Sequence, residues 1–365
     1  MCGICGIISP ARGAPSDRVI IRDMARAIAH RGPDEEGFFH DAHAALGHRR
    51  LSIIDLKSGR QPLYNEDGSK IIVFNGEIYN YEHLRTRLSR AGHAFRTNSD
   101  TETILHLYEE EGPACVESLR GMFAFAIWDK EDKRLFAARD RLGIKPFYYA
   151  DVDETLVFGS EIKAVLRSRR VAASVDYEAL CDYLTFMYVP APKSIFRQIR
   201  KLPAGHYLQY DRNGLAIRKY WDVDFSGTGD LDQRDYIDNL NAIIDDSVRM
   251  RMISEVPLGA FLSGGIDSSM VVATMKGVSG RPVKTNSVGF NEAAFDELDY
   301  ARETSRLFGT EHHEYTVDMD SSRVLDLLAW HYDEPFADSS ALPTYHVSRM
   351  TRQNVTVALS GDGGD

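Results

Sequence analysis

The chain has 365 residues, enough for two domains that each bury a core, and its formal net charge of −11 disfavours a nucleic-acid partner. Met1 to Ile20 lacks the apolar core of a signal peptide, and no apolar run reaches the roughly 18 residues of a membrane span. The four cysteines lack the spacing of a disulfide framework, which indicates a reducing compartment, so we expect a soluble, cytoplasmic protein.

The chain begins with a thiol that can become its N-terminal residue. If Met1 is removed, Cys2 carries a thiol and a free α-amine, with ordinary pKa values of about 8.5 and about 7.7–8.0. The amine can then take the thiol proton, as in hydrolases with an N-terminal Thr. Cys2 and Cys5 also form a CxxC, so a redox pair or half of a metal site are alternatives. No second close Cys or His pair accompanies it, and residues 4–8 read as a strand.

The rest of the first half mixes predicted strands and helices. They are a helix with one apolar face over 20–28, a strand over 70–74, helices over 81–90 and 101–111, a hairpin with strands 121–128 and 135–139, short strands near 147–149 and 156–158, and a helix from 160. Asp100 is the predicted N-cap of the second of the paired helices. This order predicts a layered α+β domain.

Polar residues near these elements form a candidate site. Arg50 can hold a carboxylate with both arms of its guanidinium group, or can form a surface ion pair. Asn75 and Gly76 are predicted to end a strand with their backbone N–H groups free, which suits an oxyanion hole, and a turn at these residues is the alternative. Glu77 and Asp100 can receive an ammonium group. Together with Cys2, these residues suit an α-amino acid that carries a side-chain carbonyl.

The first half also resembles a known family. Eight motifs resemble, in this order, the glutaminase domain of class II glutamine amidotransferases: MCGICGI, HRGPD, RLSIID, QPLYN, FNGEIYN, NSDTE, GMFAFAIWD and RDRLGIKPFYY. The resemblance covers nearly all of residues 2–165 and implies the fold of an N-terminal-nucleophile hydrolase, with two sheets between helices.

The resemblance also implies roles for the candidate residues. Cys2 would be the nucleophile, and Asn75 and Gly76 would form the oxyanion hole. The residues that would bind glutamine are Arg50, Leu51, Ser52, Ile53, Ile54, Asn75, Gly76, Glu77 and Asp100.

A polar, Gly-rich stretch divides the chain. Residues 222–232 contain Ser-Gly-Thr-Gly-Asp and form the best linker. We therefore expect a glutaminase domain over residues 2–221, in which 176–221 extend the first domain or bridge to the second, and a second domain over residues 233–365.

The second half alternates strands and helices, which predicts a doubly wound parallel α/β sheet with ligands at the carboxyl ends of its strands. The predicted strand 256–262 leads into a Ser-Gly-Gly loop over 263–269, and a helix is expected from Met270. Such a loop can bind an anion, and its embedded Asp267 suits phosphate with Mg²⁺. It lacks the Gly-Lys-Ser/Thr of a Walker A motif.

Four motifs of this half, FLSGGIDSS, NSVGF, DEPFADSS and LSGDGGD, resemble the ATP-pyrophosphatase domain of asparagine synthetases, an adenine nucleotide α-hydrolase-like fold. The implied ATP-binding residues are Leu262, Ser263, Gly264, Gly265, Asp267, Ser268, Ser269, Val288, Ser360 and Gly361. Asp267 and Asp365 would bind Mg²⁺, and Asp362 would act in forming an acyl-adenylate, although a solvated loop charge is the plain alternative for Asp362.

The two resemblances together predict glutamine-dependent asparagine synthesis. Cys2 would hydrolyse glutamine to glutamate and ammonia, ATP would adenylate aspartate, and ammonia would displace AMP. Alternatives are the same two steps on a sugar-acid, peptide or secondary-metabolite carboxylate, glutaminase activity alone, and a non-catalytic or redox role of Cys2 and Cys5. We expect ATP and Mg²⁺ as cofactors, small-molecule substrates, and no nucleic-acid or membrane partner, with a homodimer as one option.

The second domain is short for this resemblance. The chain stops at Asp365 inside a Gly-rich loop, where a parallel α/β sheet normally begins its next helix. About 130 residues follow the linker, which is small for this class of domain. We expect a fragment or an incomplete second domain, with the glutaminase half whole.

Overall fold

The computed structural model describes residues 1–11, 18–227, 229, 232–290, 297–317 and 324–364. They fall into two compact units. The first contains Met1–Asp224 and also Tyr332–Ala337, and the second contains Phe225–His331 and Asp338–Asp365. The chain therefore leaves the first unit, returns to it for a short segment, and leaves again.

The first unit contains two six-stranded sheets, and among the described residues the neighbouring strands of both sheets pair antiparallel. In the order β10-β8-β9-β1-β3-β2, the first sheet contains β1 (Gly3–Ile8), β2 (Glu35–His40), β3 (Ala44–Arg50), β8 (Tyr148–Val152), β9 (Thr155–Gly159) and β10 (Arg200–Lys201). In the order β12-β11-β7-β6-β5-β4, the second contains β4 (Leu63–Tyr64), β5 (Lys70–Ile78), β6 (Gly121–Asp129), β7 (Arg134–Arg139), β11 (His206–Asp211) and β12 (Gly214–Lys219).

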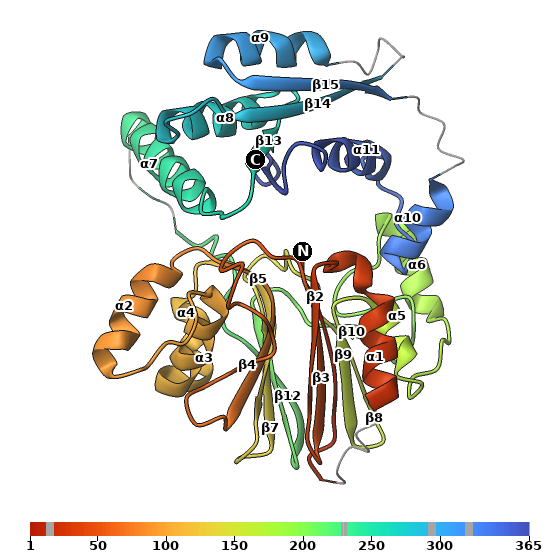
Figure 1. Ribbon diagram of the computed structural model, residues 1–365. Helices are drawn as coiled ribbons and strands as arrows, with labels where there is room; N and C mark the ends of the chain where they lie inside the picture. Colours follow the sequence, from red (N-terminus) through yellow and green to blue (C-terminus); the bar gives the residue numbers. More distant parts are fainter. Residues whose placement is uncertain (12–17, 228, 230–231, 291–296, 318–323, 365) are drawn as a thin grey trace. The chain divides into compact units, whose positions relative to one another are not determined.

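Helices cover the outer face of each sheet (Figure 1). The first sheet is covered by α1 (Arg18–Ala27) and α5 (Ile162–Arg167), and the second by α2 (Tyr81–Ala91), α3 (Asp100–Glu111) and α4 (Cys115–Ser118). A further helix, α6 (Tyr177–Phe186), follows α5 in the chain. The layers are helix, sheet, sheet, helix, which confirms the N-terminal-nucleophile type of sandwich expected for this half.

The alternation of residues along β1 explains the layering. Ile4 and Ile8 belong to the core between the sheets, whereas Cys5 and Ile7 belong to the core under α1. Successive side chains of a strand point to opposite faces, so one short strand contributes to both cores. Cys5 is 0% exposed and free of any disulfide, so it is a core residue.

Two local boundaries differ from those predicted. β5 continues to Ile78, because β6 pairs with it along its whole length, including Asn75 with Ala124 and Gly76 with Phe123. Asn75 and Gly76 therefore lie within a strand, and the prediction that the strand ends at them is wrong. The cap of α3 is Ser99, whose side chain accepts the N–H of Thr101, whereas Asp100 is the first helical residue.

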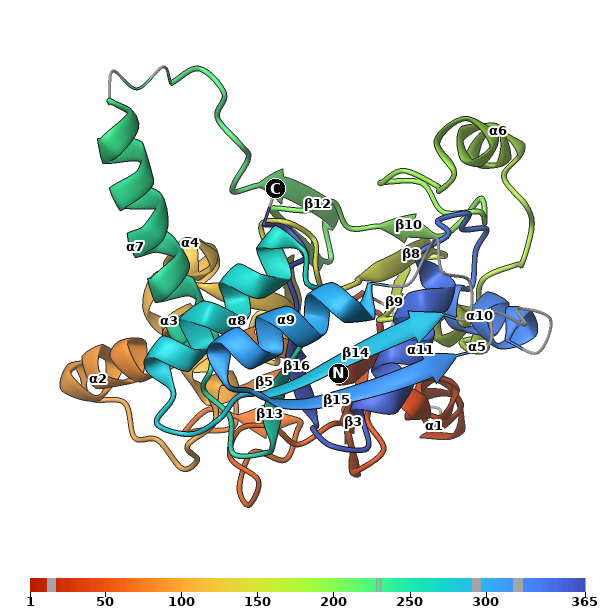
Figure 2. The same ribbon diagram turned by 90° about the horizontal axis from the view of Figure 1, so that it is seen from above.

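The second unit is built on a parallel four-stranded sheet in the order β15-β14-β13-β16. Its strands are β13 (Leu258–Phe261), β14 (Lys284–Phe290), β15 (Glu311–Val317) and β16 (Val357–Leu359), and its helices are α7 (Gln233–Arg251), α8 (Ile266–Val278), α9 (Leu298–Phe308), α10 (Leu325–Tyr332) and α11 (Ala341–Thr351). Figure 1 shows α9 and α11 on opposite faces of the sheet, and Figure 2 shows α8 beside α9. The predicted doubly wound parallel sheet is confirmed.

The start of α8 corrects a prediction. The helix begins at Ile266 and not at Met270, so Asp267, Ser268 and Ser269 lie in its first turn rather than in a loop. The Ser268 hydroxyl donates to the Gly265 carbonyl and lies 3.0 Å from the Ser263 hydroxyl. These short-range hydrogen bonds start the helix early.

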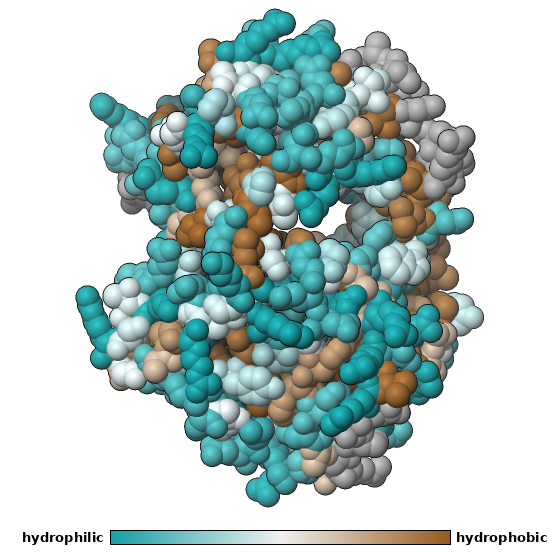
Figure 3. Space-filling view, viewed as in Figure 1, coloured by the Kyte–Doolittle hydropathy of each residue, from teal (hydrophilic) through white to brown (hydrophobic). Residues whose placement is uncertain are grey.

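The polarity of the surface and the character of the helices are those of a protein whose apolar side chains are mostly inside. Hydrophilic side chains cover most of the visible face of the first unit (Figure 3). Among the described residues, no helix combines the length and the apolar character that crossing a membrane requires.

The core between the two sheets gives a test of the fold. Trp128 is 0% exposed, and its indole Nε1 donates to Asp41 Oδ2 at 2.7 Å. We expect Trp128→Ala to lower the free energy of unfolding of the first unit by about 3–5 kcal/mol, because it leaves a large cavity and removes the indole donor from Asp41 Oδ2. Urea unfolding followed by far-UV circular dichroism measures this loss. Trp330→Ala, at a position 47% exposed in the second unit, is the control, and a loss at Trp128 no larger than the control's would contradict this assignment.

Candidate functional site

The Cys2 thiol lies where β1 begins, against the segment that follows β3. The Leu51 N–H points at Cys2 Sγ at 3.4 Å, and Cys2 Sγ is 3.6 Å from the Leu51 carbonyl oxygen. Arg31 Nε donates to the Cys2 carbonyl at 2.9 Å, which fixes the main chain of the nucleophile candidate. Burial raises the pKa of the Cys2 thiol, while the Leu51 N–H and the positive charges of the N-terminus and Arg50 oppose that rise.

The α-amine of the described chain belongs to Met1. Burial lowers the pKa of this amine to about 6. Lys145 Nζ lies 3.0 Å from Met1 Sδ, and burial lowers the pKa of Lys145 to about 8. The pairing of thiol and amine on one residue therefore requires that Met1 be removed, so that the amine moves to Cys2.

The inward face of β5 changes from apolar to polar along its length. Ile71 and Val73 belong to the core between the sheets, and Asn75 and Glu77 continue the same alternation. The Glu77 carboxylate raises the pKa of the N-terminal amine, and the positive charge of the amine lowers the pKa of Glu77. This polar end of β5 therefore lies near the Cys2 end of β1.

Asn75 is a buried amide with unused hydrogen-bonding groups. Its side chain is 0% exposed, and neither Oδ1 nor Nδ2 has a hydrogen-bond partner among the described residues. A buried polar group without a partner is costly, about 1–3 kcal/mol, and is rare in folded proteins. An oxygen of a bound substrate would satisfy the Nδ2 donor, as the predicted oxyanion role requires.

Gly76 is required by the close pairing of β5 with β6. A Cβ atom at this position would lie 2.2 Å from the Met122 carbonyl oxygen. The structure therefore gives a packing reason for glycine, in addition to the backbone role predicted for its N–H.

Glu77 and Asp100 form a pair of buried carboxylates. Asp100 Oδ2 accepts the Ile78 N–H at 2.9 Å, so helix α3 and strand β5 meet at this point. Burial and the charge of Asp100 raise the pKa of Glu77 to about 7, and burial raises the pKa of Asp100 to about 6. A cationic group placed between them would reverse both shifts, so the pair suits an ammonium ligand.

Arg50 is buried and already engaged. Its Nη1 lies 2.8 Å from Glu35 Oε2, and its Nη2 donates to the carbonyls of Asp55 at 2.6 Å and Ile54 at 3.2 Å. The side chain is 4% exposed, so it is not a surface ion pair. Of the neighbouring predicted residues, Leu51 contacts the thiol, Ser52 donates its N–H to Asp34 at 2.8 Å, and Ile53 is part-exposed.

A charged cluster behind Cys2 was missed by the sequence interpretation. Glu161 Oε1 lies 2.9 Å from Arg31 Nη1 and 2.8 Å from His30 Nε2, and Glu161 Oε2 contacts Lys163 Nζ. Arg31 in turn holds Cys2. The motif HRGPD contains His30 and Arg31, but nothing in its spacing points to a partner 130 residues away in the chain.

The segment Tyr332–Ala337 reaches the same cluster from beyond the predicted linker. Asp333 Oδ1 lies 3.1 Å from Lys163 Nζ, and Glu334 Oε1 lies 2.5 Å from Lys201 Nζ. These acids belong to the DEPFADSS motif that the sequence assigns to the ATP half, yet they lie within the first unit.

In the second unit, two loops meet at the N-terminus of α8. Gly264 has a φ of +85°, and a Cβ atom there would lie 2.5 Å from Tyr300 Cβ. A Cβ atom on Gly361 would lie 2.7 Å from the Ser268 nitrogen, and one on Gly364 would lie 2.7 Å from Asp267 Oδ1. The loops after β13 and β16 are therefore close-packed, as neighbouring parallel strands predict.

The remaining predicted ATP residues surround this junction. Leu262 is buried and donates its N–H to the Asn286 carbonyl at 3.0 Å, Val288 lies in β14, and Ser360 follows β16. Asp362 is exposed, and Asp365 lies outside the described residues. Glycines that allow close backbone approach, with a helix N-terminus and the carboxylate of Asp267, fit a phosphate chain with a divalent cation.

Comparisons with known proteins give one family match for each half of the chain. Residues 1–221 match the model of a glutamine amidotransferase domain, and residues 239–365 match that of an asparagine synthase. The chain is 40% identical to "Asparagine synthetase [glutamine-hydrolyzing] 1" of Bacillus subtilis, over 100% of this chain and 58% of that protein. It is 40% identical to "Putative asparagine synthetase [glutamine-hydrolyzing] 2" of Methanocaldococcus jannaschii, over 100% of this chain and 74% of that protein.

Among solved structures, a glutamine phosphoribosylpyrophosphate amidotransferase of B. subtilis matches with a TM-score of 0.46 and 15% identity, over 86% of this chain and 81% of that chain. The chain spans little more than half the length of the B. subtilis asparagine synthetase that it matches. The family models and the sequence identities place it plainly: the chain belongs to the glutamine-hydrolysing asparagine synthetase family.

Proposed function

We propose that residues 2–221 hydrolyse glutamine at Cys2, and that residues 233–365, joined by the linker 222–232, begin the domain that consumes the ammonia in ATP-dependent synthesis of asparagine. The observation that carries the proposal is the buried amide of Asn75, which has no hydrogen-bond partner among the described residues and lies on the strand face that also presents Glu77. A nucleophilic thiol, an amide donor and two carboxylates are the groups that cleavage of the glutamine side chain needs. The free cysteines agree with a cytoplasmic enzyme.

The glutaminase step follows from these groups. After removal of Met1, the Cys2 amine takes the thiol proton, and the thiolate attacks the carboxamide carbon of glutamine. Asn75 Nδ2 and the Gly76 N–H stabilise the oxyanion that forms. The C–N bond breaks, the amine returns the proton to the leaving ammonia, and water then hydrolyses the thioester to glutamate.

Substrate orientation is assigned to the charged groups around the thiol. Glu77 and Asp100 hold the α-ammonium group of glutamine, and Arg50 faces its α-carboxylate. Because the guanidinium group of Arg50 is held by Glu35 and two carbonyls, it serves best as a fixed positive charge beside the Leu51–Ile54 backbone.

The second half is assigned the activation of the acceptor. An aspartate carboxylate attacks the α-phosphorus of ATP, pyrophosphate leaves, and ammonia then displaces AMP to give asparagine. Ser263 to Gly265, Ser268 and Ser269 hold the phosphates, Leu262 and Val288 flank the adenosine, the Ser360-Gly361 backbone lies beside it, and Asp362 acts in forming the adenylate. Asp267, together with Asp365, would hold Mg²⁺, which neutralises charge on the pyrophosphate.

A cysteine pair tests the nucleophile. We expect Cys2→Ala to abolish release of glutamate from glutamine, because no other described thiol lies at the site, and Cys5→Ala to retain most of the activity, because Cys5 is a core residue. Glutamate release measures activity, and intact mass measures removal of Met1. Full activity in a chain that keeps Met1 would contradict the assignment of the Cys2 amine as the base, and equal losses in both variants would favour a redox role of the pair.

The raised pKa values of Glu77 and Asp100 predict a pH dependence. Both carboxylates must be ionised to hold an ammonium group, and their pKa values are about 7 and about 6 in the free protein. We therefore expect KM for glutamine to rise as the pH falls from about 8 to about 5, with a smaller change in kcat. Glu77→Gln should raise KM for glutamine and weaken the variation of KM with pH. Glu82→Gln, a change at an exposed position on α2, should leave KM and its variation with pH unchanged. A KM that does not vary over this pH range would count against the carboxylate pair.

An isotope experiment tests the whole proposal. Glutamine labelled with ¹⁵N at the amide, supplied with aspartate and ATP to the longest native form of the protein, should give asparagine labelled at its amide, with AMP and pyrophosphate in equal amounts. Pyrophosphate release that requires a different carboxylate would reassign the acceptor. If labelled ammonia is released but no carboxylate acceptor causes release of pyrophosphate from ATP, glutaminase activity would be the only part of the proposal that holds.

A further inference from the structure

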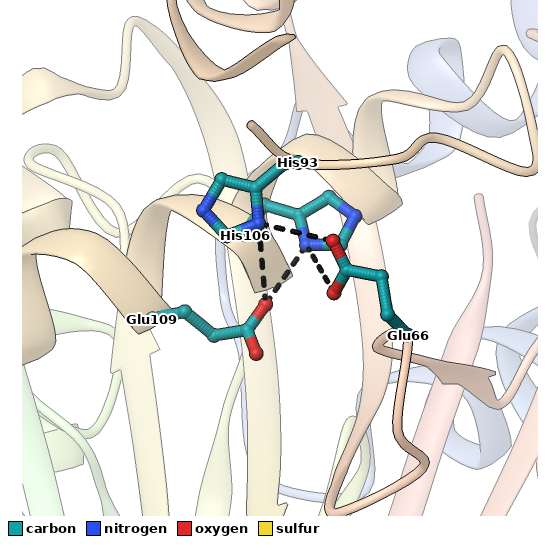
Figure 4. A group of neighbouring side chains, drawn as sticks. All are labelled: Glu66, His93, His106 and Glu109. Atoms are coloured by element: carbon teal, nitrogen blue, oxygen red, sulfur yellow. Dashed lines mark hydrogen bonds and ion pairs between the residues drawn. The ribbon is translucent and has the colours of Figure 1, made fainter. Parts of the chain in front are cut away.

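Four side chains far from Cys2 in the chain converge on one point of the first unit (Figure 4). They are Glu66 between β4 and β5, His93 just after α2, and His106 and Glu109 on α3. One nitrogen or oxygen atom from each lies within 4.8 Å of the corresponding atoms of the other three. This quartet, Glu66, His93, His106 and Glu109, contains two imidazoles and two carboxylates.

The local fold brings the quartet together for simple reasons. His106 and Glu109 are three residues apart on α3, so they share a face of the helix. Gly92 ends α2 with a φ of +111°, which turns the chain so that His93 follows directly. Glu66 lies in a turn closed by the Gly68 N–H and the Asn65 carbonyl at 3.2 Å.

The distances between the donor atoms suit a single small cation. His106 Nδ1 is 2.8 Å from Glu109 Oε2 and 3.4 Å from Glu66 Oε2. His93 Nδ1 is 3.1 Å from Glu66 Oε1 and 3.9 Å from Glu109 Oε2. Four donors placed tetrahedrally around zinc at its usual bond lengths of about 2.0–2.2 Å are separated by about 3.3–3.6 Å. The observed separations lie on both sides of this value.

The outer contacts of the quartet independently point to a ligand. In both histidines Nδ1 faces the centre. His93 Nε2 is 3.0 Å from Glu110 Oε1, whereas His106 Nε2 is 3.7 Å from Glu102 Oε1, beyond hydrogen-bond distance, and is buried without a hydrogen-bond partner among the described residues. The contact of His93 is the arrangement common in metal-binding imidazoles, in which an outer carboxylate fixes the tautomer that leaves the inner nitrogen free. Asn65 Nδ2 donates to Glu109 Oε1 at 2.6 Å, and the Ala94 N–H donates to Glu66 Oε1 at 3.1 Å, which orients both carboxylates.

An ion-pair cluster without metal is the competing explanation, and one contact disfavours it. The rings of His93 and His106 lie 4.6 Å apart at 33°, so protonating both would place two positive charges side by side. The carboxylates of Glu66, Glu102, Glu109 and Glu110 surround the two imidazoles, and one divalent cation would offset their negative charge.

We propose that Glu66, His93, His106 and Glu109 bind one divalent transition-metal ion, best matched by zinc, as a structural site. Two imidazoles and two carboxylates occupy four positions, as in closed structural zinc sites, and leave none for a substrate. The ion joins the β4–β5 turn and the end of α2 to α3. Because α3 begins at Asp100, this clamp holds the helix that presents a carboxylate to the proposed glutamine site, at its other end.

Metal content and thermal stability test the proposal on the full chain, purified without a histidine tag. We expect one zinc per chain by mass spectrometry of the elements, loss of that zinc on dialysis against a strong chelator, and a fall in Tm that added zinc reverses. Cobalt added to the stripped protein should give the intense visible absorption bands of a tetrahedral site.

Variants locate the ion. His93→Ala and Glu66→Gln should each lose the metal and its stabilisation, whereas His83→Ala, an exposed histidine on α2, should retain both. Glu66→Gln keeps the shape of the side chain, so it remains informative if His93→Ala does not fold. A chain that contains no metal, binds no zinc or cobalt, and has the same Tm with and without chelator would overturn the proposal and establish the ion-pair cluster instead. Metal that His93→Ala and Glu66→Gln both retain would place it elsewhere and overturn the proposal equally.

Discussion

The alternation of side chains along β5 is the constraint on which the first unit depends. Its inward positions place Ile71 and Val73 in the core between the sheets, and the same period then places Asn75 and Glu77 at the end of that core. A site for a polar ligand is thus built as the continuation of a packed strand. The full-length pairing of β5 with β6 makes its positions rigid, which is what preorganised catalytic groups require.

Burial of charge is the second organising feature of the site. Cys2, Glu77 and Asp100 all have raised pKa values, because the space they share is largely removed from water. Arg31, Arg50 and Lys145 partly compensate, and none of them neutralises the carboxylate pair by direct contact in the described structure. A cationic group bound between the two carboxylates would lower the pKa of both, so binding at this site and its ionisation are coupled.

The sequence predicted the architecture of both halves because their periodic patterns and Gly-rich loops are local signals. Local competition produced the errors: Ser99 caps α3 in place of Asp100, β5 extends past Phe74 through its pairing with β6, and α8 begins at Ile266. The charged pairs of Glu161 and the quartet of Glu66, His93, His106 and Glu109 could not be predicted, since their members come from separate elements and no spacing in one sequence reveals them. The roles of the catalytic and ATP-binding residues remain predictions.

The return of Tyr332–Ala337 to the first unit has a consequence for dividing this protein into parts. A boundary drawn at the linker would deprive Lys163 of the Asp333 carboxylate and Lys201 of the Glu334 carboxylate, both in positions with little access to water. Losing one member of a sheltered ion pair is destabilising. The first unit is therefore not a contiguous module, and an excised version needs either this hexapeptide supplied separately or neutral replacements for the two lysines.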